Sequence, residues 1–158
     1  MCHVGGMLTD AKPLPSISVR FIPPMKLAFL RATGPYTQSV NEAWRQMFAW
    51  LDGRGHIAST GRGYGLAYDD PKKTLSSRIR YDAGVQIPPT WDVVDEALVR
   101  VQTFAGGSYT MQRYVCPYDQ VGKIISQTRR DVLPRSGLAL DPSRPILCIH
   151  YSDPRYVG

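Results

Sequence analysis

A thiol and an imidazole stand two residues apart near the end of the chain, at Cys148 and His150. A thiol beside an imidazolium is activated as a nucleophile, so this pair is a candidate for covalent catalysis. Side chains at i and i+2 of a strand stand about 6 to 7 Å apart and run parallel, which is a poor geometry for a direct hydrogen bond. A lone buried cysteine is usually a small hydrophobe. No catalytic residue is therefore predicted.

The pattern also gives little support to metal or cofactor chemistry. The histidines, His3, His56 and His150, are far apart and have no carboxylate or cysteine at ligand spacing, so no metal site is predicted. Gly61-x-Gly63-x-Gly65 opens a strand rather than a helix, and therefore lacks the context of a dinucleotide-binding loop. We expect these glycines to allow close backbone packing, and we predict no cofactor.

Strand alternation separates the side chains that face a helix layer from those on the opposite face. Residues 78–87 carry an apolar set, expected in the core, and an alternate set that contains arginine and aspartate. Residues 108–115 and 146–151 divide in the same way, and both place polar or thiol groups on the second face. The predicted ligand-binding residues on that face are Arg80, Asp82, Gln112, Tyr114, Cys148 and His150.

Small residues complete this second face. In residues 63–68 the bulky side chains are expected in the core, which leaves Gly63, Gly65 and Ala67 on the opposite side. A face that is part small and part polar suits a ligand groove, and a solvent-exposed sheet is the equal alternative. Trp91 lies in the link between residues 78–87 and 98–104 and belongs to no periodic apolar pattern. It is predicted either to pack as a plug in this linker or to form the rim of the groove.

The elements that position these residues occur twice. Residues 31–55 match residues 113–137 at an offset of 82, and the match resumes downstream at an offset of 83. A duplicated unit predicts two similar halves related by a pseudo-twofold axis, with a groove where they meet. The matches include Arg31 with Arg113, Pro35 with Pro117, Tyr36 with Tyr118, Leu51 with Leu133, Tyr68 with Tyr151 and Asp70 with Asp153.

The predicted elements of each unit follow the order β-α-β-β. In the first unit Pro23 and Pro24 interrupt the opening strand, and Thr37 is placed to cap a helix that runs to about Leu51. In the second unit Asp119 is expected to cap the helix. The expected strands are residues 18–22, 26–32, 63–68 and 78–87, then 98–104, 108–115 and 146–151.

The residues after this last strand are too few for a final strand of the second unit. We therefore expect an α+β fold, a tandem βαββ repeat with a central groove and the last strand of the second repeat missing. Residues 1–16 are predicted to be a flexible arm. Residues 17–158 form one domain, with repeat one at 17–88 and repeat two at 97–158. An uncovered strand edge invites pairing, so we expect either a homodimer that covers the edge or a lowered stability.

Composition bounds the setting of this domain. The 158 residues are 43% hydrophobic and 20% charged, which is typical of a globular protein. No apolar run is long enough to cross a membrane and the N-terminus lacks the pattern of a signal peptide, so we expect a cytoplasmic protein without membrane contact. The odd number of cysteines fits reduced thiols. The basic residues that give the charge of +6 are spread along the chain, which favours solvated surface over a nucleic-acid footprint.

Several short motifs together resemble the GyrI-like family, also described as the AraC effector-binding domain. They occur in the family's order over residues 17–154, and the repeat makes the resemblance fairly specific. The motifs are Leu30-Arg31-Ala32-Thr33-Gly34-Pro35-Tyr36, the helix with Ala43-Trp44, Tyr68-Asp69-Asp70-Pro71, Arg80-Tyr81-Asp82-Ala83-Gly84-Val85 and Ala105-Gly106-Gly107-Ser108-Tyr109.

This resemblance implies a central cleft that binds small, often flat, aromatic or cationic molecules. In the family the domain is either fused to a DNA-binding module, as in transcription regulators, or stands alone as a multidrug-sequestering or gyrase-inhibitor-like protein. A few members hydrolyse cyclopropane-bearing toxins. This chain has no room for a helix-turn-helix module and resembles the stand-alone type, for which we expect a small-molecule ligand. Toxin hydrolysis and interaction with gyrase or DNA are the alternatives.

One departure from the family pattern affects the choice of ligand. The family carries a glutamate in the last groove strand, and aligning Pro145 and Asp153-Pro154 without a gap places Cys148 at that position. A buried carboxylate selects cations by charge pairing and can act as a general base, whereas a neutral thiol does neither. The expected ligand is therefore flat and neutral or weakly polar, and the protein is not expected to be an enzyme.

Overall fold

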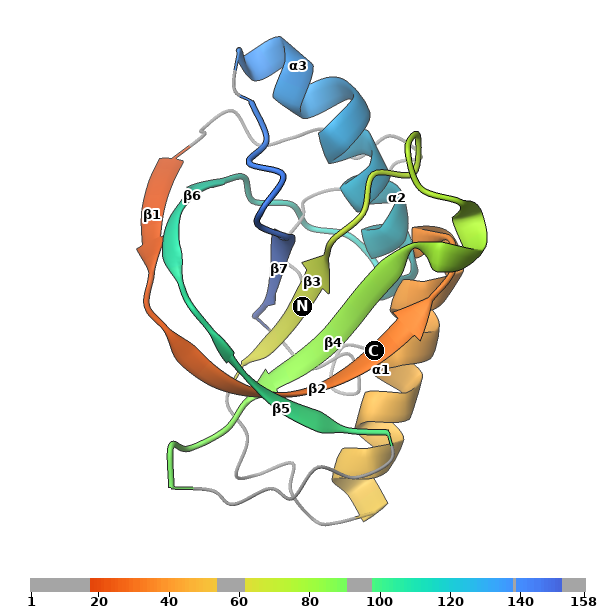
Figure 1. Cartoon of the computed structure of the whole chain (residues 1–158), viewed down its shortest axis with the longest axis vertical. Helices are drawn as coiled ribbons and strands as arrows, with labels where there is room; N and C mark the ends of the chain where they lie inside the picture. Colours follow the sequence, from red (N-terminus) through yellow and green to blue (C-terminus); the bar gives the residue numbers. More distant parts are fainter. Residues whose placement is uncertain (1–17, 54–61, 91–97, 138, 152–158) are drawn as a thin grey trace.

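The computed structural model describes residues 18–53, 62–90, 98–137 and 139–151 (Figure 1). It has an α+β fold in which every strand pair is antiparallel, as the fold class predicted from the sequence requires. The N-terminal arm, Trp91 and the last residues of the chain lie outside the described ranges. None of the described helices is long and apolar enough to cross a lipid bilayer.

Five strands form the main sheet, in the order β5-β2-β4-β3-β7. A separate pair, β1 with β6, continues two of these strands past short breaks, so that the sheet curls round in Figure 1. The first break is Pro23-Pro24, as predicted, because proline cannot donate to the ladder. The strands are β1 Ser18–Ile22, β2 Met25–Thr33, β3 Gly63–Ala67, β4 Arg80–Gln86, β5 Arg100–Phe104, β6 Gly107–Met111 and β7 Ile146–His150.

One long helix, α1 (Tyr36–Gly53), covers one face of the main sheet and packs against β2 and β4. Its buried side chains recur at three- and four-residue spacing, which forms the apolar stripe predicted from the sequence. The helix begins at Tyr36, so Thr37 lies in its first turn rather than before it. The buried residues are Tyr36, Ser39, Val40, Ala43, Trp44, Met47 and Leu51.

The second helical segment is irregular. It consists of a 3₁₀ turn (Tyr118–Gln120), α2 (Val121–Gln127), a π-helical turn (Thr128–Val132) and α3 (Leu133–Ser136). Gln120 precedes α2 and makes no side-chain capping bond, so the predicted cap at Asp119 is wrong. A 3₁₀ turn leads into α2 instead, which supplies the backbone bonds that a cap would. α2 packs mainly against α1, and a Cβ on Gly122 would collide with the carbonyl oxygen of Tyr36.

Two clusters of buried side chains lie on the two faces of the main sheet. The cluster under α1 includes Ala28 and Leu30 of β2 and Tyr81, Ala83 and Val85 of β4. The cluster on the opposite face is also apolar, so this face is packed rather than open. Its members are Met25, Leu27, Tyr64, Leu66 and Phe104, with Tyr109, Leu147 and Ile149 against them.

The face assignment of β3 differs from the prediction. Tyr64 and Leu66 belong to the cluster opposite the helix, and the small residues face α1. The reason is that aromatic side chains already fill the helix side. A Cβ on Gly63 would lie 2.7 Å from Trp44, and one on Gly65 would overlap the Tyr81 hydroxyl.

The face assignment of β7 is also reversed. Ile146 and Cys148 pack on the cluster under α1, whereas Leu147 and Ile149 pack on the opposite cluster. β7 pairs with β3, and residues directly opposite each other in a ladder share a face. Cys148 stands opposite Gly65 and His150 opposite Gly63, so both follow the small residues of β3 toward the helix.

Candidate functional site

A cavity of about 1020 Å³ lies between β6 and β7. The curled strands β1 and β6 form one wall and β7 forms the other. One side of α2 closes the cavity through Val121, Ile124 and Ile125, and Thr128 of the following π-helical turn extends this wall. In the described part of the chain no strand lies between β6 and β7, so the side of α2 that faces the cavity has no sheet against it.

The lining is largely apolar and aromatic. Tyr109 of β6 and Tyr64 of β3 present rings to the cavity, and Tyr114 is held by its hydroxyl, which donates to Gln112 Oε1 at 2.6 Å. Burial raises the pKa of Tyr114, so it stays a neutral hydroxyl. The aliphatic lining residues include Ile22, Met25, Met111, Ile124, Ile125, Leu133, Leu140, Ile146, Leu147 and Ile149.

The charged lining is predominantly basic. Among the described lining residues Asp141 is the only carboxylate, and Arg144 pairs with it at 3.1 Å. The Arg144 guanidinium also lies 4.7 Å from the centre of the Tyr109 ring. The other arginines are Arg20, Arg62 and Arg113, none of which forms an ion pair with a carboxylate of the described residues.

Two of these arginines meet on one aromatic ring. The guanidinium carbon of Arg62 lies 4.8 Å from the centre of the Tyr151 ring, and that of Arg113 lies 5.8 Å from the same point. Arg62 precedes β3, Arg113 follows β6 and Tyr151 follows β7. Three segments far apart in sequence therefore place two positive charges at one end of the cavity.

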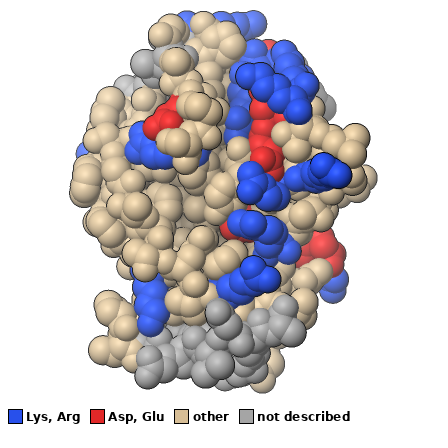
Figure 2. Space-filling model, in the orientation of Figure 1, with Lys and Arg blue, Asp and Glu red and all other residues tan. Residues whose placement is uncertain are grey.

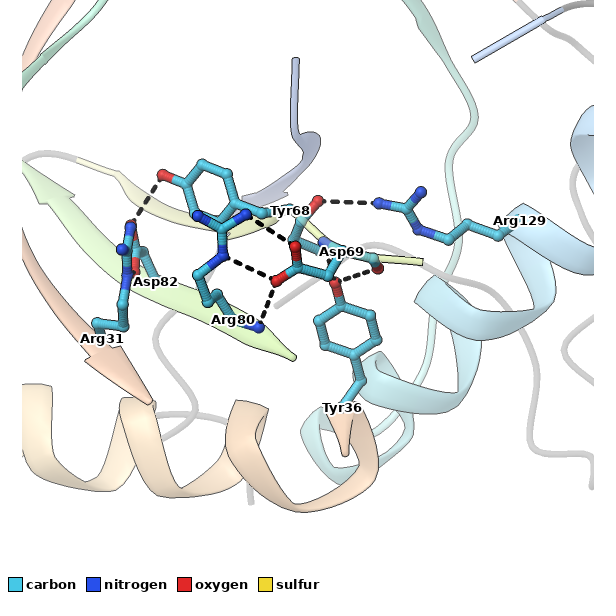
Figure 3. A network of polar contacts seen from close by, with 8 residues as sticks. Arg31, Tyr36, Tyr68, Asp69, Arg80, Asp82 and Arg129 are labelled. Atoms are coloured by element: carbon cyan, nitrogen blue, oxygen red, sulfur yellow. Dashed lines mark hydrogen bonds and ion pairs between the residues drawn. The ribbon is translucent and has the colours of Figure 1, made fainter. Parts of the chain in front are cut away.

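A polar network lies elsewhere, on the face of the sheet away from α1 (Figure 3). Arg31 of β2 donates two hydrogen bonds to Asp82 of β4, from Nε to Oδ1 at 2.7 Å and from Nη2 to Oδ2 at 2.9 Å. The Tyr68 hydroxyl donates to Asp82 Oδ2 at 2.8 Å. Burial and the adjacent Asp82 carboxylate raise the pKa of Tyr68 to about 12. Asp82 is fully buried and its charge is already balanced.

Asp69 is the second centre of this network. Its carboxylate accepts from the backbone amide of Arg80 at 2.7 Å and from the Arg80 guanidinium at 2.8 and 2.9 Å, which holds the pKa of Asp69 below its usual value. The Tyr36 hydroxyl donates to the Asp69 carbonyl oxygen and accepts from the Asp69 amide. Arg129, after α2, donates to the carbonyl oxygen of Ala67. In Figure 3 these contacts join α1, β3, β4 and the second helical segment.

The predicted ligand-binding residues fall into separate places. Gln112, Tyr114 and Cys148 line the cavity. Arg80 and Asp82 do not, because each is engaged in the polar network.

His150 lies outside the cavity as well. It is buried on the helix side, where it stacks on Tyr118 with ring centres 5.3 Å apart and meets Trp44 edge-on at 4.8 Å. Neither ring nitrogen has a hydrogen-bond partner among the described residues, and burial lowers its pKa to about 3. In the described ranges no three metal-ligating side chains gather.

The sequence did not single out Arg62, Arg113 or Tyr151 as site residues. Arg113 and Tyr151 appear in the repeat, as the counterparts of Arg31 and Tyr68. This correspondence could have identified Arg113 and Tyr151 from the sequence, because Arg113 contacts the Tyr151 ring just as Arg31 contacts the Tyr68 ring.

Comparison with curated proteins finds similar sequences. A protein named DNA gyrase inhibitor 2 from Dickeya dadantii (strain 3937) is 30% identical over 90 residues, 56% of each chain. A DNA gyrase inhibitor from Pectobacterium carotovorum subsp. carotovorum (strain PC1) is 24% identical over 99 residues, 61% of this chain and 62% of that one. The chain thus matches just over half the length of these curated relatives.

A solved structure shares the fold. The crystal structure of an uncharacterized conserved protein from Listeria innocua superposes with a TM-score of 0.50 at 14% identity, covering 92% of this chain and 87% of that chain. The model of the GyrI-like small molecule binding domain matches residues 15–157, nearly the whole sequence. The chain therefore belongs to the GyrI-like small-molecule-binding family.

Proposed function

We propose that this protein binds a small, flat and largely apolar molecule in the cavity between β6 and β7. The observation that carries the proposal is the cavity itself, whose volume of about 1020 Å³ and lining of tyrosine and aliphatic side chains suit an aromatic ligand. Gln112, Tyr114 and Cys148 contribute polar atoms to its wall. Drug or toxin sequestration, or a regulatory role, would follow from such binding.

We further infer that the two halves of the chain are related by a pseudo-twofold axis. The offset of 82 carries β1 onto β5 and the start of β2 onto the start of β6. It also carries Tyr36, where α1 begins, onto Tyr118, where the second helical segment begins. The strand pairing is consistent with this, since β1 pairs with β6 as β2 pairs with β5.

This relationship gives the cavity a place in the fold. In the first half β4 lies between β2 and β3, and α1 packs against it. The corresponding place in the second half lies between β6 and β7, over α2, and there the described residues leave a cavity. We propose that the ligand occupies the position that a strand takes in the first half.

A thermal-shift screen of planar aromatic compounds, followed by mass spectrometry of the hits, tests the proposal. Binding to the folded state raises the melting temperature by an amount that grows as ligand concentration exceeds Kd. Leu147 lines the cavity, so the larger side chain of Leu147→Trp should occupy part of it and abolish the shifts. Val19 is 73% exposed and outside the cavity lining, so Val19→Trp adds the same side chain as a matched control. Equal shifts in both variants would place binding elsewhere.

The same experiment addresses toxin hydrolysis, because a hit whose mass changes during incubation is a substrate rather than a ligand. A second candidate is binding to gyrase or DNA. It is favoured by the basic side chains that gather in a column on the right of Figure 2, with acidic ones between them. Arg31 lies two residues after Phe29 on β2, and Arg100 of β5 pairs with Phe29, so the two arginines share a sheet face. Salt-sensitive retention on DNA, or inhibition of supercoiling by gyrase, would support this candidate.

A further inference from the structure

We propose that the cavity selects an organic anion, an aromatic or aliphatic carboxylate, whose carboxylate binds between Arg113 and Tyr151. The inference rests on the function proposed above and names the ligand class for the same cavity. It departs from the sequence-based expectation of a neutral ligand because Arg62 and Arg113 line the cavity.

The first half of the chain shows what such a site looks like when it is complete. The Arg31 guanidinium lies 5.1 Å from the centre of the Tyr68 ring. The Asp82 carboxylate sits against both, accepting two hydrogen bonds from Arg31 and one from the Tyr68 hydroxyl. A bidentate arginine with a phenol is a strong and directional carboxylate receptor. Here the receptor is filled by the protein's own strand β4.

The second half repeats the receptor without the carboxylate. Arg113 and Tyr151 are the counterparts of Arg31 and Tyr68 at offsets of 82 and 83. The guanidinium carbon of Arg113 lies 5.8 Å from the centre of the Tyr151 ring. Asp82 belongs to β4, and the described residues provide no strand in the corresponding place beside β6. No described carboxylate pairs with Arg113. The open position faces the cavity, which both residues line.

The surrounding charges favour the same ligand. Arg62 contacts the same Tyr151 ring, so two guanidinium groups approach one ring, and neither forms an ion pair with a carboxylate of the described residues. A carboxylate bound beside the Tyr151 ring would be attracted by both of these positive charges. Asp141, the described carboxylate of the lining, is neutralised by Arg144. A lipophilic cation would therefore find two positive charges and no free acid of the described residues at this end of the cavity.

The rest of the ligand would lie on the apolar lining. Tyr64 lines the cavity along with Arg62 and Tyr151, and burial keeps its hydroxyl neutral by raising its pKa. Leu147 and Ile149 of β7 line the same cavity. An apolar body attached to a single carboxylate matches this combination of charged end and hydrophobic wall.

Three probes that differ only in the end of one arm separate the outcomes: pyrenebutyrate, pyrenebutanol and pyrenebutylammonium, titrated by fluorescence anisotropy at low and moderate salt. We expect pyrenebutyrate to bind about tenfold more tightly than the ammonium probe, with the difference falling as salt rises. Arg113→Gln should weaken pyrenebutyrate about tenfold and leave pyrenebutanol unchanged. Arg78→Gln is the matched control, because Arg78 is exposed and lies outside the cavity lining.

Each result decides between the two proposals. If none of the probes binds, the proposed function falls together with this inference. If all three bind equally, the cavity binds ligands and the anion receptor is wrong. Tight pyrenebutyrate binding that Arg113→Gln and Arg78→Gln affect to the same extent would show general attraction to a basic protein, and would also overturn the receptor. Because Arg113 is exposed, its variant should fold, which circular dichroism would verify.

Discussion

Arg31 and Asp82 form a two-pronged ion pair in which the partners differ in exposure. The Asp82 side chain is wholly buried, whereas 40% of the Arg31 side chain is exposed. A buried carboxylate depends on its partners for all of its solvation, whereas a partly exposed guanidinium can still be hydrated. Substitution of Arg31 and substitution of Asp82 should therefore change the free energy of unfolding by different amounts.

Arg31→Gln should destabilise the protein more than Asp82→Asn does. The first change leaves a buried carboxylate with one hydroxyl donor, at a cost of about 3 kcal/mol in the free energy of unfolding. The second keeps an acceptor for Tyr68 and lets Arg31 turn to water, at a cost of about 1 kcal/mol. Urea denaturation measures both. Arg45→Gln, which breaks an exposed pair on α1, is the control and should leave stability unchanged. Equal losses at Arg31 and Asp82 would contradict this account.

His150 should make stability fall as the solution becomes acidic. Burial lowers the pKa of the folded protein's imidazole from 6.5 to about 3. The unfolded chain therefore takes up a proton from pH 6.5 downward while the folded state does not, so stability is complete above pH 6.5 and lost toward pH 3. The loss at pH 5 should be about 2 kcal/mol.

His150→Phe tests this assignment. Phenylalanine keeps the aromatic contacts with Trp44 and Tyr118 and cannot titrate. The slope of unfolding free energy between pH 6.5 and pH 5 should flatten in the variant, because carboxylates such as Asp69, whose ordinary pKa is 3.8, take up protons mainly below this range. An unchanged slope would assign the acid sensitivity to other groups.

Gly122 should be needed for the contact between α1 and α2. A Cβ at this position would collide with the backbone carbonyl of Tyr36, and backbone cannot swing aside as a flexible side chain can. Gly122→Ala should therefore cost about 2 kcal/mol by forcing the helices apart. A Cβ on Gly53, at the end of α1, would meet no described atom within 4 Å, so Gly53→Ala is the control. Similar thermal stability of the two variants would show that α2 can shift away from Tyr36 without loss of stability.

Self-association should compete with ligand binding. In the described part of the chain β6 pairs only with β1 and β7 only with β3, so each has one edge without a strand beside the cavity. Such edges invite pairing with a second copy. Sedimentation velocity should show dimers at high protein concentration and fewer of them with saturating pyrenebutyrate. A monomer at every concentration would rule out this mode of pairing.

The sequence predicted the elements better than the faces they present. Periodic apolar spacing located α1, and Pro23-Pro24 located the break after β1, because both signals are local. The sequence pattern assigns the faces of β3 and β7 wrongly, because side-chain bulk alone does not mark the side that faces the helix. Trp44 and Tyr81 already occupy that side, and only Gly63 and Gly65 fit beneath them. The face that a residue of β3 presents to α1 therefore depends on the side chains that α1 and β4 already place there.

The site was predictable only in part. Alternation along residues 108–115 predicts Gln112 and Tyr114 on the face away from the helices, but β6 ends at Met111 and Tyr114 packs against Ile124 of α2. Both residues nevertheless line the cavity. Alternation does not predict that Asp82 forms an ion pair with Arg31, because that pair depends on the register between β2 and β4. The charged end of the cavity was less accessible still, as Arg62, Arg113 and Tyr151 come from three separate segments.

Strands of the first half of the chain pair with strands of the second half, which affects folding during synthesis. Met25 of β2 pairs with Phe104 of β5, and Gly63 of β3 pairs with His150 of β7, partners that are separated by about half the chain. During synthesis the first half emerges with one edge of β2 and one edge of β3 unmatched until the second half follows. Contacts this distant slow folding, because the loop must close before they stabilise anything. Nascent chains should therefore pass through an interval in which these edges are open to chaperones or to one another.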